Sequence, residues 1–163
     1  MNFEYTCSKC GKKHSGPPSL SFQSPEHYLA LNDEDKKKSY LNEDLCVVLN
    51  QDYFIRVVLE VPIIGANESF LWGIWVSQSK SNYEYYSEHF DEDLKGRQSF
   101  GWIANVLPGY QDTLALESTV LFGGRGSRPK IHLHESKHQL AIDFHQGMSM
   151  EKAIQIAEKA LHL

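Results

Sequence analysis

Residues 7–14, CSKCGKKH, hold two of the chain's three cysteines and a histidine. Two thiolates separated by two residues can face one metal ion, and zinc prefers four sulfur and nitrogen ligands in a tetrahedron. Gly11 follows the second cysteine, and glycine tolerates the positive φ that a tight turn requires. His14 is close enough along the chain to fold back as a third ligand. This spacing predicts a zinc-binding loop.

The third cysteine, Cys46, is the predicted fourth ligand. It lies in the apolar run 45–49, which we expect to form a strand that can pair near the N-terminal segment. The full ligand set, which uses every cysteine, is Cys7, Cys10, His14 and Cys46. A zinc site with four protein ligands is closed and therefore structural rather than catalytic.

Other interpretations of these residues stay open. Cys46 could be an ordinary buried thiol, because free cysteine is among the most buried residue types. His14 could be a surface residue, and the loop would then hold two reduced thiols without a metal. A redox pair is the third interpretation, but the reactive cysteine of a thioredoxin-type motif lies at a helix N-terminus. Residues 11–17 are a poor helix, which weakens that interpretation.

A second group of candidate ligands lies in residues 132–138, HLHESKH. His132 and His134 would share one face of a strand. Together with His138 or Glu135 they could hold a metal ion with an open position, as in metal-dependent hydrolases. Alternation with apolar residues is equally typical of the polar outer face of a strand. The sequence carries no Walker A loop, nucleophile elbow or HExxH motif. We therefore favour a non-catalytic protein, with a small metal-dependent hydrolase as the alternative.

The elements that must position these residues are mostly strands. Residues 45–134 are mostly β in pattern, and alternating apolar residues over 55–63 and 70–76 predict two long antiparallel strands. We expect an α+β fold: a mainly antiparallel sheet with helices on one side and a small Cys loop within residues 1–18.

The C-terminal residues 137–162 change to a helical period. A first helix is expected over 138–146, and Ser149 is a good cap for a second. One stripe of the second helix is predicted to face the core. Its members are Met150, Ile154, Ala157 and Leu161. No long linker divides the chain, so residues 1–163 are expected to form a single domain.

Composition limits the classes of partner. The net charge is −5 and the pI about 5.9, which argues against a nucleic-acid binder, although Lys9, Lys12 and Lys13 form a small basic patch. The N-terminus lacks the apolar region of a signal peptide, and no apolar run approaches the roughly 20 residues of a membrane span. An odd number of cysteines without a disulfide framework indicates a reducing, cytoplasmic location. The partner is then a protein or small molecule that the sequence does not identify, and the oligomeric state is equally undefined.

Motifs along nearly the whole chain carry a family resemblance. They are Cys7-x-x-Cys10-Gly11-x-x-His14, Asp44-x-Cys46, Phe54-x-Arg56, Trp72-Gly73-x-Trp75-Val76-Ser77, Phe100-Gly101-Trp102, Leu107-Pro108-x-Tyr110, Pro129-x-Ile131, His138-x-Leu140-Ala141 and Gly147. With these motifs the chain resembles the bacterial domain-of-unknown-function family 2199. Gln139 is a departure, because the family pattern has proline after the histidine. The resemblance implies a bacterial family but no particular activity.

Overall fold

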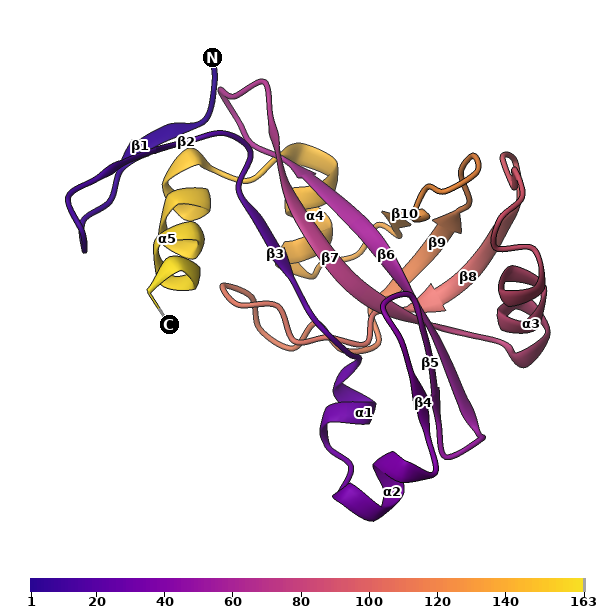
Figure 1. Cartoon of the computed structure of the whole chain (residues 1–163). Coiled ribbons are helices and arrows are strands. Elements are labelled where there is room, and N and C mark those ends of the chain that lie inside the picture. Colours follow the sequence, from indigo (N-terminus) through magenta and orange to yellow (C-terminus); the bar gives the residue numbers. More distant parts are fainter. Residues whose placement is uncertain (163) are drawn as a thin grey trace.

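The computed structural model describes residues 1–162, in which five helices and ten strands form (Figure 1). The helices are α1 Glu26–Leu29, α2 Asp33–Lys37, α3 Lys80–Glu88, α4 Gln139–Gln146 and α5 Met150–Leu161. The strands are β1 Glu4–Thr6, β2 Lys13–Ser15, β3 Ser19–Ser21, β4 Tyr40–Leu41, β5 Leu45–Val48, β6 Asp52–Pro62, β7 Ser69–Gln78, β8 Gln98–Trp102, β9 Glu117–Leu121 and β10 Lys130–Leu133. The α+β prediction is confirmed. No helix within residues 1–162 has the length and apolar character that crossing a bilayer requires.

Two sheets form. The small one is the β1–β2 hairpin, and the large one has the strand order β3-β7-β6-β10-β9-β8. Strand β5 also pairs with β6, and β4 pairs with β5. Pairing is antiparallel except for β3 with β7 and β10 with β6. The predicted long hairpin is confirmed as β6 and β7, whose register runs from Tyr53 opposite Gln78 to Pro62 opposite Ser69.

The large sheet curls until its last strand, β8, returns to β7. Ile103 forms an antiparallel bridge with Val76, and the Ala104 N–H donates to the Trp75 carbonyl at 2.9 Å. A Cβ at Gly101 would lie 2.8 Å from the Ser77 carbonyl oxygen, so only glycine allows this close approach. The closure buries both faces of β6 near its start, where sequence alternation predicted a single buried face: Phe54, Ile55, Arg56 and Val57 are all buried.

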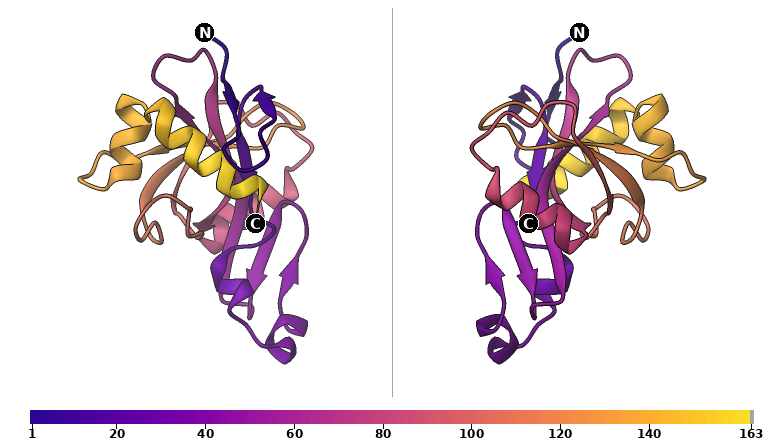
Figure 2. Two further views of the ribbon diagram at one scale, coloured as in Figure 1. Left: turned by 90° about the vertical axis from the view of Figure 1, so that its left-hand side faces the viewer. Right: turned by 90° about the vertical axis from the view of Figure 1, so that its right-hand side faces the viewer.

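The buried side chains form two clusters. The larger cluster fills the curled sheet and includes residues from the β1–β2 hairpin and from α5. The smaller cluster contains Cys46, Val48, Phe54, Trp75 and Ala104. The β4–β5 pair and α2 project at the opposite end of the molecule from the β1–β2 hairpin (Figures 1 and 2).

Helix α5 lies beside the β1–β2 hairpin in each view (Figures 1 and 2). Its buried residues are Ala153, Ile156 and Ala157, and Met150 and Ile154 are partly buried against the core. Leu161, by contrast, is 56% exposed. The predicted stripe is therefore wrong at Leu161, because the helix extends past the edge of the sheet and its last turn faces the loop of the hairpin.

Candidate metal centre

The β1–β2 hairpin brings three of the predicted ligands together. Tyr5 pairs with His14 across the hairpin, and their rings lie 5.3 Å apart between centroids. In the loop, the Cys7 N–H donates to the Lys12 carbonyl and the Gly11 N–H donates to the Cys7 carbonyl, both at 2.9 Å. Gly11 has φ +71°, the positive value expected from its place after the second cysteine. The hairpin thus turns the two sulfurs back toward the return strand.

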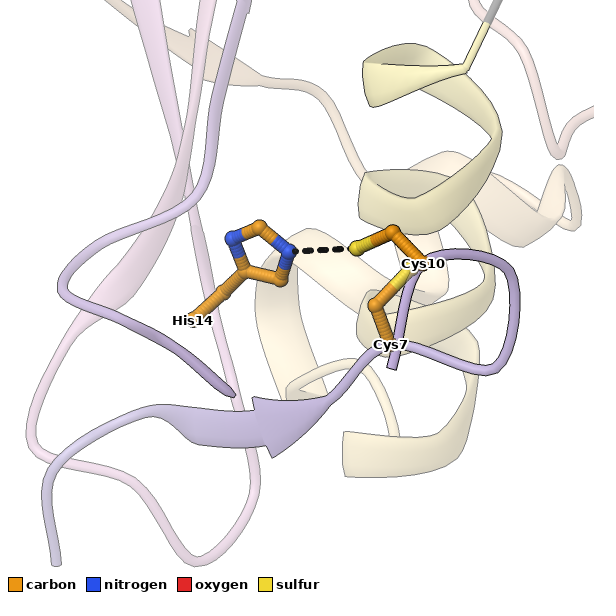
Figure 3. A group of neighbouring side chains, drawn as sticks. All are labelled: Cys7, Cys10 and His14. Atoms are coloured by element: carbon orange, nitrogen blue, oxygen red, sulfur yellow. Dashed lines mark hydrogen bonds between the residues drawn. The ribbon is translucent and has the colours of Figure 1, made fainter. Parts of the chain in front are cut away.

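The ligand atoms of Cys7, Cys10 and His14 all lie within 4.8 Å of one another. Figure 3 shows the His14 ring facing the Cys10 sulfur, with Cys7 beside it; His14 Nε2 is 3.5 Å from the Cys10 Sγ. In a tetrahedral zinc site the ligand atoms lie roughly 3.3–3.8 Å apart, given the usual Zn–S and Zn–N bond lengths. The Cys10–His14 distance lies in this range, and the two sulfurs and the imidazole nitrogen could together hold a metal ion.

Local hydrogen bonds favour the thiolate form of Cys7. Burial raises the pKa of the thiol, but backbone N–H donors from Cys10 and Lys9 outweigh burial and lower the pKa below its ordinary value. Thiolates, not thiols, are the metal-binding form of cysteine. The Cys7 thiol therefore ionises more readily than an ordinary thiol does.

Two residues of α5 contact the loop, and the sequence analysis missed both. The Glu158 carboxylate accepts from the Ser8 N–H and from the Ser8 hydroxyl, each at 2.8 Å. His162, which ends the helix, places its Nε2 3.1 Å from the Cys7 Sγ. Both lie about 150 residues from their partners, so no local spacing could have pointed to them.

Cys46 is not brought to this group. It is fully buried on β5, opposite Phe54 of β6 and Leu41 of β4, at the projecting end of the molecule. Burial raises the pKa of its thiol to about 12, which keeps it protonated. The structure therefore does not place Cys46, the predicted fourth ligand, with the other three, because β5 pairs with β6 at the end distant from the hairpin.

The three histidines of the second candidate group are also separate. His134 lies against the Thr119 hydroxyl, with Nε2 at 2.9 Å, and His132 packs edge-on against the ring of Phe144. His138 caps α4: its Nδ1 accepts from the Leu140 N–H at 3.0 Å, and its Nε2 contacts the Gln111 carbonyl. Within residues 1–162 the three ligands of the hairpin are the only compact His, Cys and carboxylate group of three or more.

A family model described as an uncharacterized protein conserved in bacteria, DUF2199, matches residues 6–148. The chain belongs to this family. No curated protein and no solved structure matches the chain. The matched residues contain the three clustered ligands of the hairpin but end before α5.

The structure explains one departure from the DUF2199 pattern. Gln139 is the first residue of α4, directly after the His138 cap. Proline suits this position because the first helical N–H has no partner within the helix. Here the Gln139 side chain instead donates to the Asp143 carboxylate at 2.8 Å. The helix start is therefore kept without the proline.

A cavity of about 630 Å³ lies where the segment from β8 returns to β7, away from the β1–β2 hairpin. Phe100 and Trp102 of β8 line it and are 45% and 51% exposed. Polar side chains at its edge include Asp52, Lys80 and Asn82. A hollow of this size, mainly apolar and with a few polar groups, is typical of a small-molecule site.

Proposed function

We propose that this DUF2199 protein is a non-catalytic, cytoplasmic interaction or ligand-binding module whose N-terminal loop holds a structural zinc ion. The observation that carries the proposal is the compact group of Cys7, Cys10 and His14. The two thiolates and the imidazole would hold the ion, and the ion would fix the conformation of the loop. Such a site needs reduced thiols, as found in the cytoplasm.

The binding part of the proposal rests on the cavity lined by Phe100 and Trp102. Exposed aromatic rings supply contact area that polar groups at the rim can orient. The ligand would be a small molecule with an apolar body and at least one polar group. Asp52 and Lys80, which carry opposite charges, would select its orientation.

Two alternatives have less support. A hydrolase built on the histidines of residues 132–138 would need them as joint ligands, yet both ring nitrogens of His138 are engaged by the backbone. Nucleic-acid binding through the lysines of the loop is opposed by the net charge of −5. Lys13 is moreover 3.1 Å from the Glu4 carboxylate across the hairpin, an ion pair that offsets its charge.

The test of the zinc site is the metal content of protein purified without chelator under reducing conditions. We expect about one zinc per chain, lost in Cys7→Ser and kept in Cys46→Ala, the matched control for removal of a thiol. Protein without zinc would overturn the proposal. Zinc that survives Cys7→Ser but disappears in His132→Ala would favour the hydrolase instead.

The test of the cavity is a small-molecule screen read by intrinsic fluorescence. Trp72 and Trp75 are fully buried, whereas Trp102 lines the cavity, so a bound ligand should change the emission of Trp102. Binding should be lost in Phe100→Ala and kept in Tyr40→Ala, which removes an exposed aromatic ring elsewhere. Hits that bind equally to both variants would argue against this cavity as the binding site.

A further inference from the structure

The fourth position of the zinc site has a candidate at the far end of the chain. His162 Nε2 lies 3.1 Å from Cys7 Sγ, while His14 Nε2 lies 3.5 Å from Cys10 Sγ. Each sulfur of the loop is therefore in contact with one imidazole nitrogen. One imidazole comes from the return strand of the hairpin and the other from the end of α5.

We propose that His162 is the fourth zinc ligand, so that a Cys₂His₂ site joins the N-terminal hairpin to the C-terminal helix. This proposal rests on zinc binding by the hairpin, as proposed above. It replaces Cys46 in the ligand set and converts three ligands with an open position into a closed structural site. The metal would then link the end of α5 to the hairpin directly, in addition to the packing and hydrogen bonds between them.

The position of His162 suits a ligand that closes on binding. Its ring lies outside the compact group of three and contacts that group at Cys7. The residue is exposed and follows the last helical residue, so its side chain can turn without disturbing packed neighbours. A rotation of the side chain toward Cys10 and His14 would complete the set, in which the ligand atoms around zinc lie roughly 3.3–3.8 Å apart.

A second contact holds α5 in the register that this ligand requires. Glu158 lies four residues before His162, so the two side chains share one face of the helix. The paired hydrogen bonds from Ser8 to Glu158 fix the helix along its axis relative to the loop. Ser8 is next to Cys7 in sequence, so the same register brings His162 to the sulfur.

Charge also favours two thiolates over three at this place. Two thiolates neutralise the charge of Zn²⁺, and two neutral imidazoles complete the tetrahedron without adding charge. A third thiolate would leave the site with a net negative charge close to the Glu158 carboxylate. The His162 ligand avoids that repulsion.

Packing alone leaves room between the hairpin and α5. A cavity of about 330 Å³ lies there, lined by Phe3, Tyr5 and Ala157 among others. The zinc ion would add a direct link at the end of the helix beside this opening.

The test compares zinc affinity, measured by chelator competition, in full-length wild-type protein and three variants. We expect His162→Ala to weaken zinc binding by at least about tenfold. Even the loss of a residue that only hydrogen-bonds to a metal ligand typically costs that much affinity. His162→Phe, which keeps a planar ring but has no ligand nitrogen, should weaken zinc binding to the same extent. His89→Ala is the matched control, since His89 also follows the last residue of a helix, α3, and should change nothing.

Two further measurements separate ligation from folding. X-ray absorption of the zinc-loaded protein should give two sulfur and two nitrogen neighbours, with one nitrogen lost in His162→Ala. Hydrogen exchange in the last turns of α5 should slow with zinc in the wild type and not in His162→Ala. Zinc bound to the wild type with unchanged affinity and spectrum in His162→Ala would overturn the role of His162 alone. Absence of zinc from the wild type would overturn the proposed zinc site itself, and the role of His162 with it.

Discussion

The two ends of α5 are attached to the rest of the protein in different ways. Near its start, Lys152 lies 3.1 Å from the Asp143 carboxylate of α4, which also accepts from the Tyr110 hydroxyl at 2.7 Å. Near its end, Glu158 and His162 contact the exposed Cys loop. At the first attachment the Asp143 carboxylate is buried, and protein groups alone supply its hydrogen-bond partners. The second attachment brings two sulfurs and two imidazoles together, and a bound metal ion would stabilise this arrangement.

The difference shows what burial does to a polar contact. Asp143 is buried, and the Lys152 ammonium also lies 3.7 Å from the centre of the Tyr110 ring. Burial, followed by the hydrogen bond to Asp143, raises the pKa of the Tyr110 hydroxyl far above its ordinary value, so it remains a donor. Contacts of this kind are costly to break, because the remaining groups are left buried without partners. Exposed contacts on the loop can exchange with water at little cost.

The largest effect is expected at the buried end, from Asp143→Ala. The substitution leaves the Tyr110 hydroxyl and the Lys152 ammonium without their shared acceptor, and we expect a loss of about 3 kcal/mol in the free energy of unfolding. Urea denaturation measures it. Glu34→Ala, which removes an exposed ion pair with Lys38, should cost less than about 0.5 kcal/mol. Equal losses in the two variants would contradict the difference expected between a buried and an exposed polar contact.

Zinc removal should have the next largest effect. At a free zinc concentration of 100 times the dissociation constant, binding stabilises the folded protein by about 2.7 kcal/mol. For a chain of this size that corresponds to a rise of about 5–10 °C in the melting temperature. The rise should disappear in Cys7→Ser and persist in Cys46→Ala. A melting temperature that zinc does not change would contradict the metal-dependent attachment.

Tyr110→Phe should have a smaller effect at the buried end. It removes one hydrogen bond but leaves Asp143 with Gln139 and Lys152, so we expect a loss of about 1 kcal/mol in the free energy of unfolding. Tyr40→Phe, at an exposed tyrosine, is the control for loss of a hydroxyl. A loss as large as that of Asp143→Ala would mean that the tyrosine, not the carboxylate, is the centre of the network.

The smallest effect should be the pH dependence of the loop contact in zinc-free protein. Hydrogen bonds from the Ser8 backbone and then from its hydroxyl lower the pKa of Glu158 below 4.5. The folded state therefore favours the ionised Glu158 carboxylate. The stability that this carboxylate contributes is fully present above the ordinary pKa of 4.5 and is lost as the pH falls through the lowered pKa. The protection of the Ser8 amide hydrogen, measured as its exchange rate relative to an unstructured peptide at the same pH, should decrease over that range. Glu158→Gln should abolish the pH dependence, and the same dependence in that variant would exclude Glu158 as its source.

The sequence alone determined the local part of the metal centre. Cys7, Cys10 and His14 lie within eight residues, and a hairpin with Gly11 at its turn is enough to bring them together. The β6–β7 hairpin was predictable for the same reason, because its strands are neighbours in the chain and their alternation specifies the pairing. Such features involve residues close together in the chain, so the spacing of residue types in the sequence is enough to predict them.

Only the tertiary structure decided which distant residue meets the loop. Cys46 and His162 are both far from Cys7 in sequence, and the cysteine looked more suitable because of its chemistry. The pairing of β5 with β6 carries Cys46 to the opposite end of the sheet, whereas packing of Ala153, Ile156 and Ala157 directs α5 along the hairpin. The direction of α5, and the part of the sheet where β5 pairs, both depend on how side chains from the whole chain pack in the core. Residue spacing does not encode that arrangement, and so His162 could not be chosen from the sequence.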